Sequence, residues 1–112
     1  MNSPLLSTSR FFALETVKVC NEIKRFKRES VLTNPLIRPG TSIGANIREA
    51  MYAHGKADFI AKLQIALKEC SESEYWLEPL IESGCYGDLT SLKQCTGVKR
   101  LLIASLNTQK KN

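Results

Sequence analysis

A stretch of helical periodicity between Thr41 and Ile81 constrains the fold more than any other feature of the sequence. In its second half, small or apolar residues recur at steps that alternate between four and three, a spacing that places them on one helix face. These residues are Phe59, Leu63, Ala66, Cys70, Ser73, Leu77 and Leu80. Because a long amphipathic helix is unstable alone, we expect the remainder of the chain to cover this face.

Weaker helical patterns flank this stretch on both sides. One runs from Arg10 to about Glu29, with Phe12, Thr16, Val19, Ile23 and Phe26 on its apolar face, which Ala13, Val17 and Cys20 widen. Residues 1–8 are expected to form a loose lead-in. The last pattern follows a capping Asp88, with Leu89, Leu92, Cys95 or Thr96, Leu102 and Leu106 on its apolar face, and residues 108–112 are expected to fray.

The segment before Thr41 is the least regular part of the sequence. Asn34-Pro35 is typical of a helix start, but Pro39 lacks an N–H donor and disfavours helical geometry at Arg38. We expect a kink or a broken turn there, with regular helix resuming near Gly40 or Thr41. Gly84 is expected to end the long helix. Four helices with short connections predict one all-α domain over residues 1–112, an antiparallel up-down-up-down four-helix bundle.

Composition limits the setting in which such a bundle works. The 112 residues are 43% apolar and 24% charged, as in ordinary soluble proteins, and no apolar run approaches the ~20 residues of a membrane span. No long apolar segment precedes Glu15, so we expect no signal peptide and a cytoplasmic location. The four cysteines form no CxxC pair and have no neighbouring histidine, which argues against zinc and favours reduced thiols in the core.

The formal net charge of +5 is spread unevenly. The ends of the chain are basic, whereas residues 56–83 hold six acidic and three basic residues. Basic clusters of this kind favour a polyanionic partner, and the alternative is a solvated helix face around Phe26. The candidate nucleic-acid-binding residues are Lys24, Arg25, Lys27, Arg28, Lys93, Lys99 and Arg100.

A second line of residues on the long helix suggests contacts between subunits. Ile65, Glu72 and Trp76 lie off the main apolar face, and one bundle covers only one face of a helix. Asn46 and Glu49 stand among small and apolar residues, where polar pairs fix the register of helix–helix or subunit contacts. The alternative is that Glu49 is exposed and Asn46 bonds to a neighbouring helix.

Catalytic motifs are missing from the sequence. Di-metal bundles use inward Glu-x-x-His pairs, but the one histidine, His54, follows Met51 at that spacing and is expected to pack at a helix end. Glu69, Glu72, Glu74, Glu78 and Glu82 are dispersed and suit a solvated face or a basic partner. No Ser/His/Asp arrangement or phosphate-binding glycine loop is present. We therefore expect neither enzymatic activity nor a cofactor.

Two segments, TSIGANIREA and KADFIAKLQIALKECSESEYWL, resemble a family of bacterial four-helix-bundle proteins labelled large-subunit ribosomal RNA intervening-sequence proteins. The resemblance covers most of residues 11–106 and implies a bundle that assembles as a ring, typically a homopentamer. It extends to the accessory variability protein of diversity-generating retroelements, a pentamer that binds nucleic acid and a reverse transcriptase. The recognisable positions are Ser42, Ile43, Asn46, Glu49, Asp58, Phe59, Leu63, Ala66, Glu69, Glu72, Tyr75 and Trp76.

The resemblance brings no catalytic residues with it, and Pro39 departs from the polar residue usual before Gly-Thr-Ser. Two functional hypotheses follow. In the first, a non-enzymatic homo-oligomer binds RNA or DNA through its basic first and fourth helices, in support of a nucleic-acid enzyme such as a reverse transcriptase. In the second, the protein is an interaction scaffold whose partner is a polypeptide.

Overall fold

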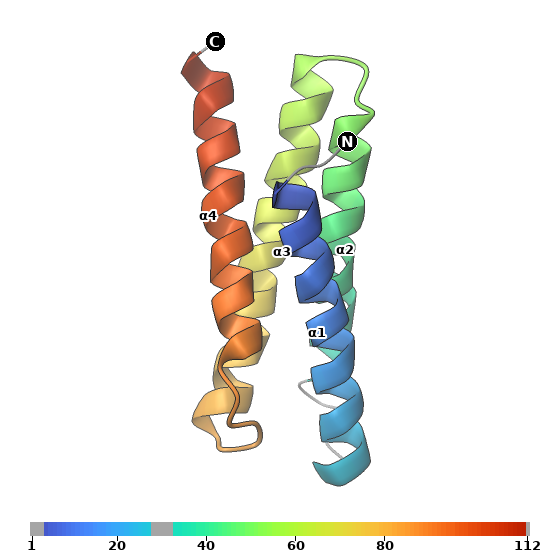
Figure 1. Ribbon diagram of the computed structural model, residues 1–112, viewed down its shortest axis with the longest axis vertical. Helices are drawn as coiled ribbons and strands as arrows, with labels where there is room; N and C mark the ends of the chain where they lie inside the picture. The colour runs from blue at the N-terminus through green and yellow to red at the C-terminus, as the bar shows by residue number, and fades with distance from the viewer. Residues whose placement is uncertain (1–3, 28–32, 112) are drawn as a thin grey trace.

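The computed structural model describes residues 4–27 and 33–111, apart from the side chains of Phe26, Lys27 and Lys111. These residues form four helices joined by short connections (Figure 1). The helices are α1 (Pro4–Lys27), α2 (Thr33–Met51), α3 (Lys56–Glu82) and α4 (Thr90–Lys111).

Consecutive helices run in opposite directions and pack side by side, and α4 returns to pack against α1 (Figure 1). Within the described residues, α1 makes no close approach to α3, nor α2 to α4, so these pairs lie diagonally across the bundle. The molecule measures 47 × 22 × 20 Å. The predicted all-α, up-down-up-down four-helix bundle is therefore confirmed.

The apolar face predicted for the long helix is the centre of the core. Along α3 the predicted residues from Leu63 to Leu80 are buried, and Phe59 packs half-buried at its end. From α1, Phe12, Val19 and Ile23 meet them, and α4 contributes Cys95, Val98 and Leu102. Leu89, in contrast, is exposed and lies before α4 begins. The 3.6-residue period thus located the core where the pattern was long and regular.

Helix α1 starts earlier than predicted. It begins at Pro4, so residues 4–8 are not a loose lead-in, and Pro4 occupies a position where its missing N–H costs little. Ser9 is buried inside the helix and donates a hydrogen bond to the Leu6 carbonyl at 2.8 Å. Val17 is more than a third exposed and does not widen the core face.

Helix α2 also differs from the prediction, because it runs unbroken from Thr33 through Pro39 to Met51. The ring of Pro39 is buried, as are Leu36 and Gly40, and this apolar packing offsets the lost backbone hydrogen bond. Gly40 allows the close approach of α1. A methyl group added there would lie 2.7 Å from the Thr16 methyl carbon, so only glycine fits.

The helix ends follow local sequence signals. Gly84, with φ of +79°, lies just beyond the end of α3 in the left-handed conformation that favours glycine. Asp88 accepts the backbone N–H of Thr90 at 2.9 Å and caps α4, as predicted. Helix α4 continues to Lys111, which contradicts the expected frayed tail over residues 108–111. His54 is exposed in the turn after α2 and does not pack against the helix end.

Candidate nucleic-acid and subunit interfaces

The bundle places its two basic helices next to each other. Helix α4 carries five basic residues and no acidic one, and α1, which packs against it, carries five basic and two acidic residues. Helix α3, diagonal to α1, carries six acidic and three basic residues. Side-by-side packing of α1 and α4 therefore concentrates positive charge on one half of the molecule.

The predicted nucleic-acid-binding residues divide into three groups. Lys24 and Arg25 are exposed near the end of α1, and Lys93 and Arg100 are exposed on α4; we call these four the α1–α4 basic surface. The end of α1 and the start of α4 lie toward the same end of the bundle (Figure 1). The side chain of Lys27 and all of Arg28 lie outside the described residues.

Lys99 forms the third group, because an acidic residue of the same chain already engages it. Its ammonium lies 2.9 Å from the Glu74 carboxylate on α3, and this hydrogen bond raises the pKa of Lys99. Thr96 donates to the same carboxylate at 3.4 Å. Lys99 thus joins α4 to α3 and contributes less free charge to the surface than its neighbour Arg100.

The structure brings four of the five predicted interface residues into contacts within one subunit. Asn46 donates to Glu69 at 2.7 Å, Glu49 pairs with Lys62 at 3.2 Å, and Glu72 pairs with Arg38 at 3.6 Å. The ring of Trp76 packs half-buried against the core and lies edge-on to Tyr75, with ring centres 5.0 Å apart. Glu49 is nevertheless exposed, and so is Ile65, at 44% of its surface.

Glu69 is the acidic residue that the sequence interpretation misplaced. It was assigned to a solvated or partner-facing surface, but it is only 6% exposed. Besides Asn46, its carboxylate accepts the Ser42 hydroxyl and lies 3.9 Å from the Arg38 guanidinium. Burial of a carboxylate is tolerable when it is hydrogen-bonded and paired in this way. The available signal was the position of Glu69 beside the apolar face of α3, opposite Ser42 and Asn46, which are one turn apart on α2.

An exposed apolar ridge on α1 was also missed. Phe11 is 63% exposed and Leu14 57% exposed, and Val17 follows at the same three-residue spacing. We call these three residues the α1 ridge. On the diagonal helix α3, Ile65 and Tyr75 are exposed, and Tyr75 has the acidic residues Glu72 and Glu78 one turn away on either side. Apolar ridges of this kind are typical of surfaces that contact a partner.

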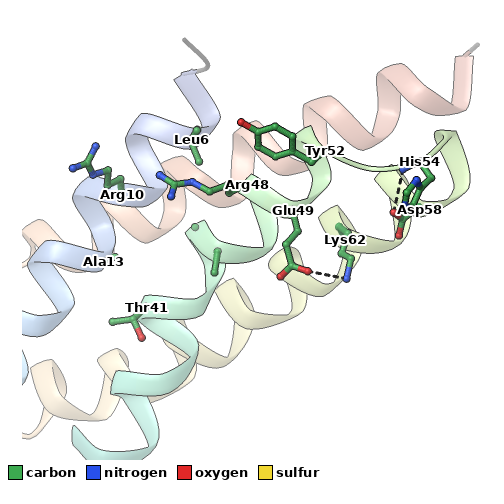
Figure 2. Close-up of a pocket in the computed structure, with 12 residues that line it drawn as sticks. Leu6, Arg10, Ala13, Thr41, Arg48, Glu49, Tyr52, His54, Asp58 and Lys62 are labelled. Carbon is green, nitrogen blue, oxygen red and sulfur yellow. Dashed lines mark hydrogen bonds and ion pairs between the residues drawn. The ribbon is translucent and has the colours of Figure 1, made fainter. Parts of the chain in front are cut away.

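A groove of about 880 Å³ runs across α2 between α1 and α3 (Figure 2). Its small floor residues include Ala13, Gly44 and Ala45. The remaining lining residues are Leu6, Arg10, Thr41, Arg48, Glu49, Tyr52, His54, Asp58 and Lys62. The groove is open to solvent.

The described residues offer little for catalysis. They contain no group of three or more His, Cys, Asp or Glu residues placed to hold a metal ion. All four cysteines are free thiols. A hydrogen bond with Cys70, together with burial, raises the pKa of Cys95 far above its ordinary value, so this thiol stays protonated at neutral pH. None of the four helices, over the residues described, has an apolar stretch suited to crossing a membrane.

These features define a small antiparallel helical bundle whose polar and charged groups serve packing and surface contacts. The sequence pattern of the family described as 23S rRNA-intervening sequence protein matches residues 2–104. The chain belongs to this family. A search of curated proteins found no match.

A solved structure supports the assignment. It is a crystal structure of a protein of unknown function from the S23 ribosomal protein family of Bacteroides thetaiotaomicron. The two chains are 40% identical with a TM-score of 0.88, and the match covers 91% of this chain and 97% of that one. The similarity therefore extends over the whole bundle, and neither description indicates an enzyme.

Proposed function

We propose that this protein is a non-enzymatic homo-oligomer that binds RNA or DNA without sequence preference through the α1–α4 basic surface. The observation that carries the proposal is the pairing of two basic helices, one of which lacks any acidic residue. Each phosphate contact is weak, but a ring would repeat the surface in every subunit, and linked weak contacts multiply affinity. Groove-reading motifs are missing from the sequence, so the electrostatic term dominates.

Assembly is supported by complementary ridges on diagonal helices. The α1 ridge is apolar beside Lys18, whereas Tyr75 on α3 has the acidic residues Glu72 and Glu78 within one turn, and Ile65 adds an exposed apolar side chain to the same helix. Two different surfaces on opposite sides of a subunit make head-to-tail contacts, which close into a ring when the rotation allows. Five subunits are favoured by the family resemblance alone.

Light scattering on the unmodified protein and two variants tests assembly. Leu14→Glu on α1 and Ile65→Glu on α3 should each release folded monomer, because each buries a carboxylate in the contact. These residues are better probes than Trp76, whose ring packs against its own core. Ile103→Glu on α4 is the matched control, since Ile103 is similarly exposed at 41%. A monomeric unmodified protein at micromolar concentration and moderate salt contradicts the proposal.

Fluorescence anisotropy with labelled duplex DNA and RNA, titrated against salt, tests nucleic-acid binding. Reversing Lys24, Arg25, Lys27 and Arg28 to Glu should abolish binding at moderate salt. The double variant Lys93→Glu/Arg100→Glu should weaken it and flatten the salt dependence. Its matched control is Lys56→Glu/Lys68→Glu, which changes net charge equally on exposed positions of α3. Equal losses in both double variants would show that net charge alone is responsible.

The second candidate function is a scaffold for a polypeptide partner, such as a reverse transcriptase or another nucleic-acid enzyme. The exposed α1 ridge favours it, because apolar side chains do not contribute to phosphate binding. The same titration separates the two functions. A protein that assembles normally but binds no nucleic acid at low salt is a scaffold. The family description refers to 23S rRNA, which is the reason to include a fragment of that RNA among the probes.

A further inference from the structure

The groove across α2 has an uneven distribution of charge. At its α3 side, Glu49 is paired with Lys62 at 3.2 Å, and Asp58 accepts the backbone N–H of His54 at 3.4 Å. Toward α1, Arg10 and Arg48 line the groove. Both arginines are exposed, and neither makes an ion pair or hydrogen bond within the part of the chain that the structure describes. The α1 side therefore holds two guanidinium groups with unused donors.

Tyr52 stands beside these arginines at the end of α2. It is 82% exposed and follows Arg48 by four residues, which is about one helical turn. Figure 2 shows Arg10, Arg48 and Tyr52 in one row along the groove. Among the described residues, the one close pair of aromatic rings is Tyr75 with Trp76, so the face of Tyr52 is not stacked on another ring.

The floor of the groove allows close approach. Ala13, Gly44 and Ala45 present little side chain, so the row of Arg10, Arg48 and Tyr52 stands above a shallow apolar surface. Sites for single-stranded nucleic acid combine these parts, a cationic groove for the backbone and an aromatic ring on which a base stacks. An acidic protein helix would also complement the charge of the arginines. A docked helix, however, is held largely by contacts between large apolar side chains, and the floor of this groove offers few of them.

We infer that this groove binds a short segment of single-stranded nucleic acid, with Arg10 and Arg48 on successive phosphates and Tyr52 stacked on a base. The inference rests on the proposed nucleic-acid function but uses a different surface. A stacking site distinguishes single strands from duplexes, in which the base faces are already covered. The α1–α4 basic surface, by contrast, recognises phosphate in either form.

The test uses fluorescein-labelled oligo(dT) and oligo(U) of about eight nucleotides, short enough to occupy about one site, with a labelled duplex measured in parallel. Tyr52→Ala should weaken single-strand binding by at least about fivefold and leave duplex binding unchanged. Tyr52→Phe keeps the ring and should retain the affinity. Ile103→Ala, at an exposed apolar residue of α4 outside the groove and the proposed subunit contact, is the matched control.

The arginines give an independent measurement. Arg10→Ala/Arg48→Ala should flatten the plot of log affinity against log salt by about 1.4 for single strands, since each phosphate contact contributes about 0.7. The control pair Lys56→Ala/Lys68→Ala, exposed on α3, should leave this slope unchanged. The inference is overturned if Tyr52→Ala and Ile103→Ala bind the single strand alike.

The outcomes separate this inference from the proposed function. If only the Lys93/Arg100 variant loses binding, the α1–α4 basic surface is the binding site and the inference about the groove is contradicted. If only the Tyr52 and Arg10/Arg48 variants lose binding, the groove is the binding site and the proposal for the α1–α4 basic surface is contradicted. If Arg10→Ala/Arg48→Ala loses labelled oligo-glutamate and oligo(dT) equally while Tyr52→Ala binds normally, the groove is a docking surface for acidic protein and the inference fails.

Discussion

At the contact between α2 and α3, buried polar groups are bonded to one another, whereas at the start of α4 they are not. Glu69 on α3 accepts Ser42 and Asn46 from α2. In the first turns of α4, the Ser91 hydroxyl and the Gln94 side-chain amide oxygen are buried and have no hydrogen-bond partner among the described residues. Both regions contribute buried apolar residues to the same core.

The difference indicates that the α2–α3 contact fixes the register of the bundle, whereas the packing of α4 only completes its core. A bonded buried carboxylate allows α2 and α3 one relative position, because any shift would leave charged and polar groups unsatisfied. Helix α4 is held by apolar packing, by the weak hydrogen bond from the Cys95 thiol to the Cys70 carbonyl and by the partly exposed pair Lys99–Glu74, which tolerate small shifts better. The more permissive helix is also the one that carries much of the basic surface.

The largest expected effect lies in the shared apolar core. Leu77→Ala on α3 and Leu102→Ala on α4 should each cost about 2–5 kcal/mol of unfolding free energy, through lost burial and a cavity. Both side chains are at most 1% exposed. Urea melts measure the two costs side by side. A much smaller cost for Leu102→Ala would show that α4 moves to fill the cavity, as expected if its position is less strictly fixed than those of α2 and α3.

Removal of Glu69 should give the next largest effect. Glu69→Ala leaves the half-buried Ser42 and Asn46 donors without their acceptor on α3, at a cost of about 1–3 kcal/mol. The matched variant is Glu74→Ala, whose partner Lys99 is partly exposed, and it should cost no more than about 1 kcal/mol. Equal losses of stability in thermal melts of the two variants would contradict the conclusion that the α2–α3 contact is more strictly fixed than that of α4.

The smallest effect differs in sign between two buried serines. Ser73 on α3 donates to the Glu69 carbonyl at 2.9 Å, so Ser73→Ala should destabilise by about 1 kcal/mol. Ser91→Ala on α4 removes a buried hydroxyl that has no partner and should be neutral or stabilising by up to about 1 kcal/mol. Denaturant melts in one buffer resolve the sign. If Ser91→Ala also destabilises, the hydroxyl has a hydrogen-bond partner such as bound water.

Sequence reasoning succeeded where one physical rule acted alone. The apolar face from Leu63 to Leu80 follows helical periodicity over many turns, and the cap at Asp88 is a local signal. It failed at Pro39, where burial of the ring outweighs a lost backbone hydrogen bond, because burial depends on helices that are distant in the sequence. The prediction for Glu69 was wrong for the same reason, since its role as an acceptor requires Ser42 and Asn46 on another helix.

The candidate sites were less predictable than the fold. Clusters of basic residues are visible in a sequence, but the pairing of Lys99 with Glu74 is not. Neither is the exposure of Phe11 and Leu14, because apolar residues in a helical segment are expected to face the core. The groove is a property of three helices together, and no local pattern encodes it.

The two prolines at the start of α2 have a consequence for how the bundle opens. Pro39 has no N–H to donate to the carbonyl of Pro35 four residues earlier, so the first turns of α2 lack one of their backbone hydrogen bonds. They are held instead by contacts such as that of Gly40 against Thr16 on α1. When α1 moves away, the start of α2 loses this support and unravels with it. Amide hydrogens in both segments should therefore exchange together, as one cooperative unit.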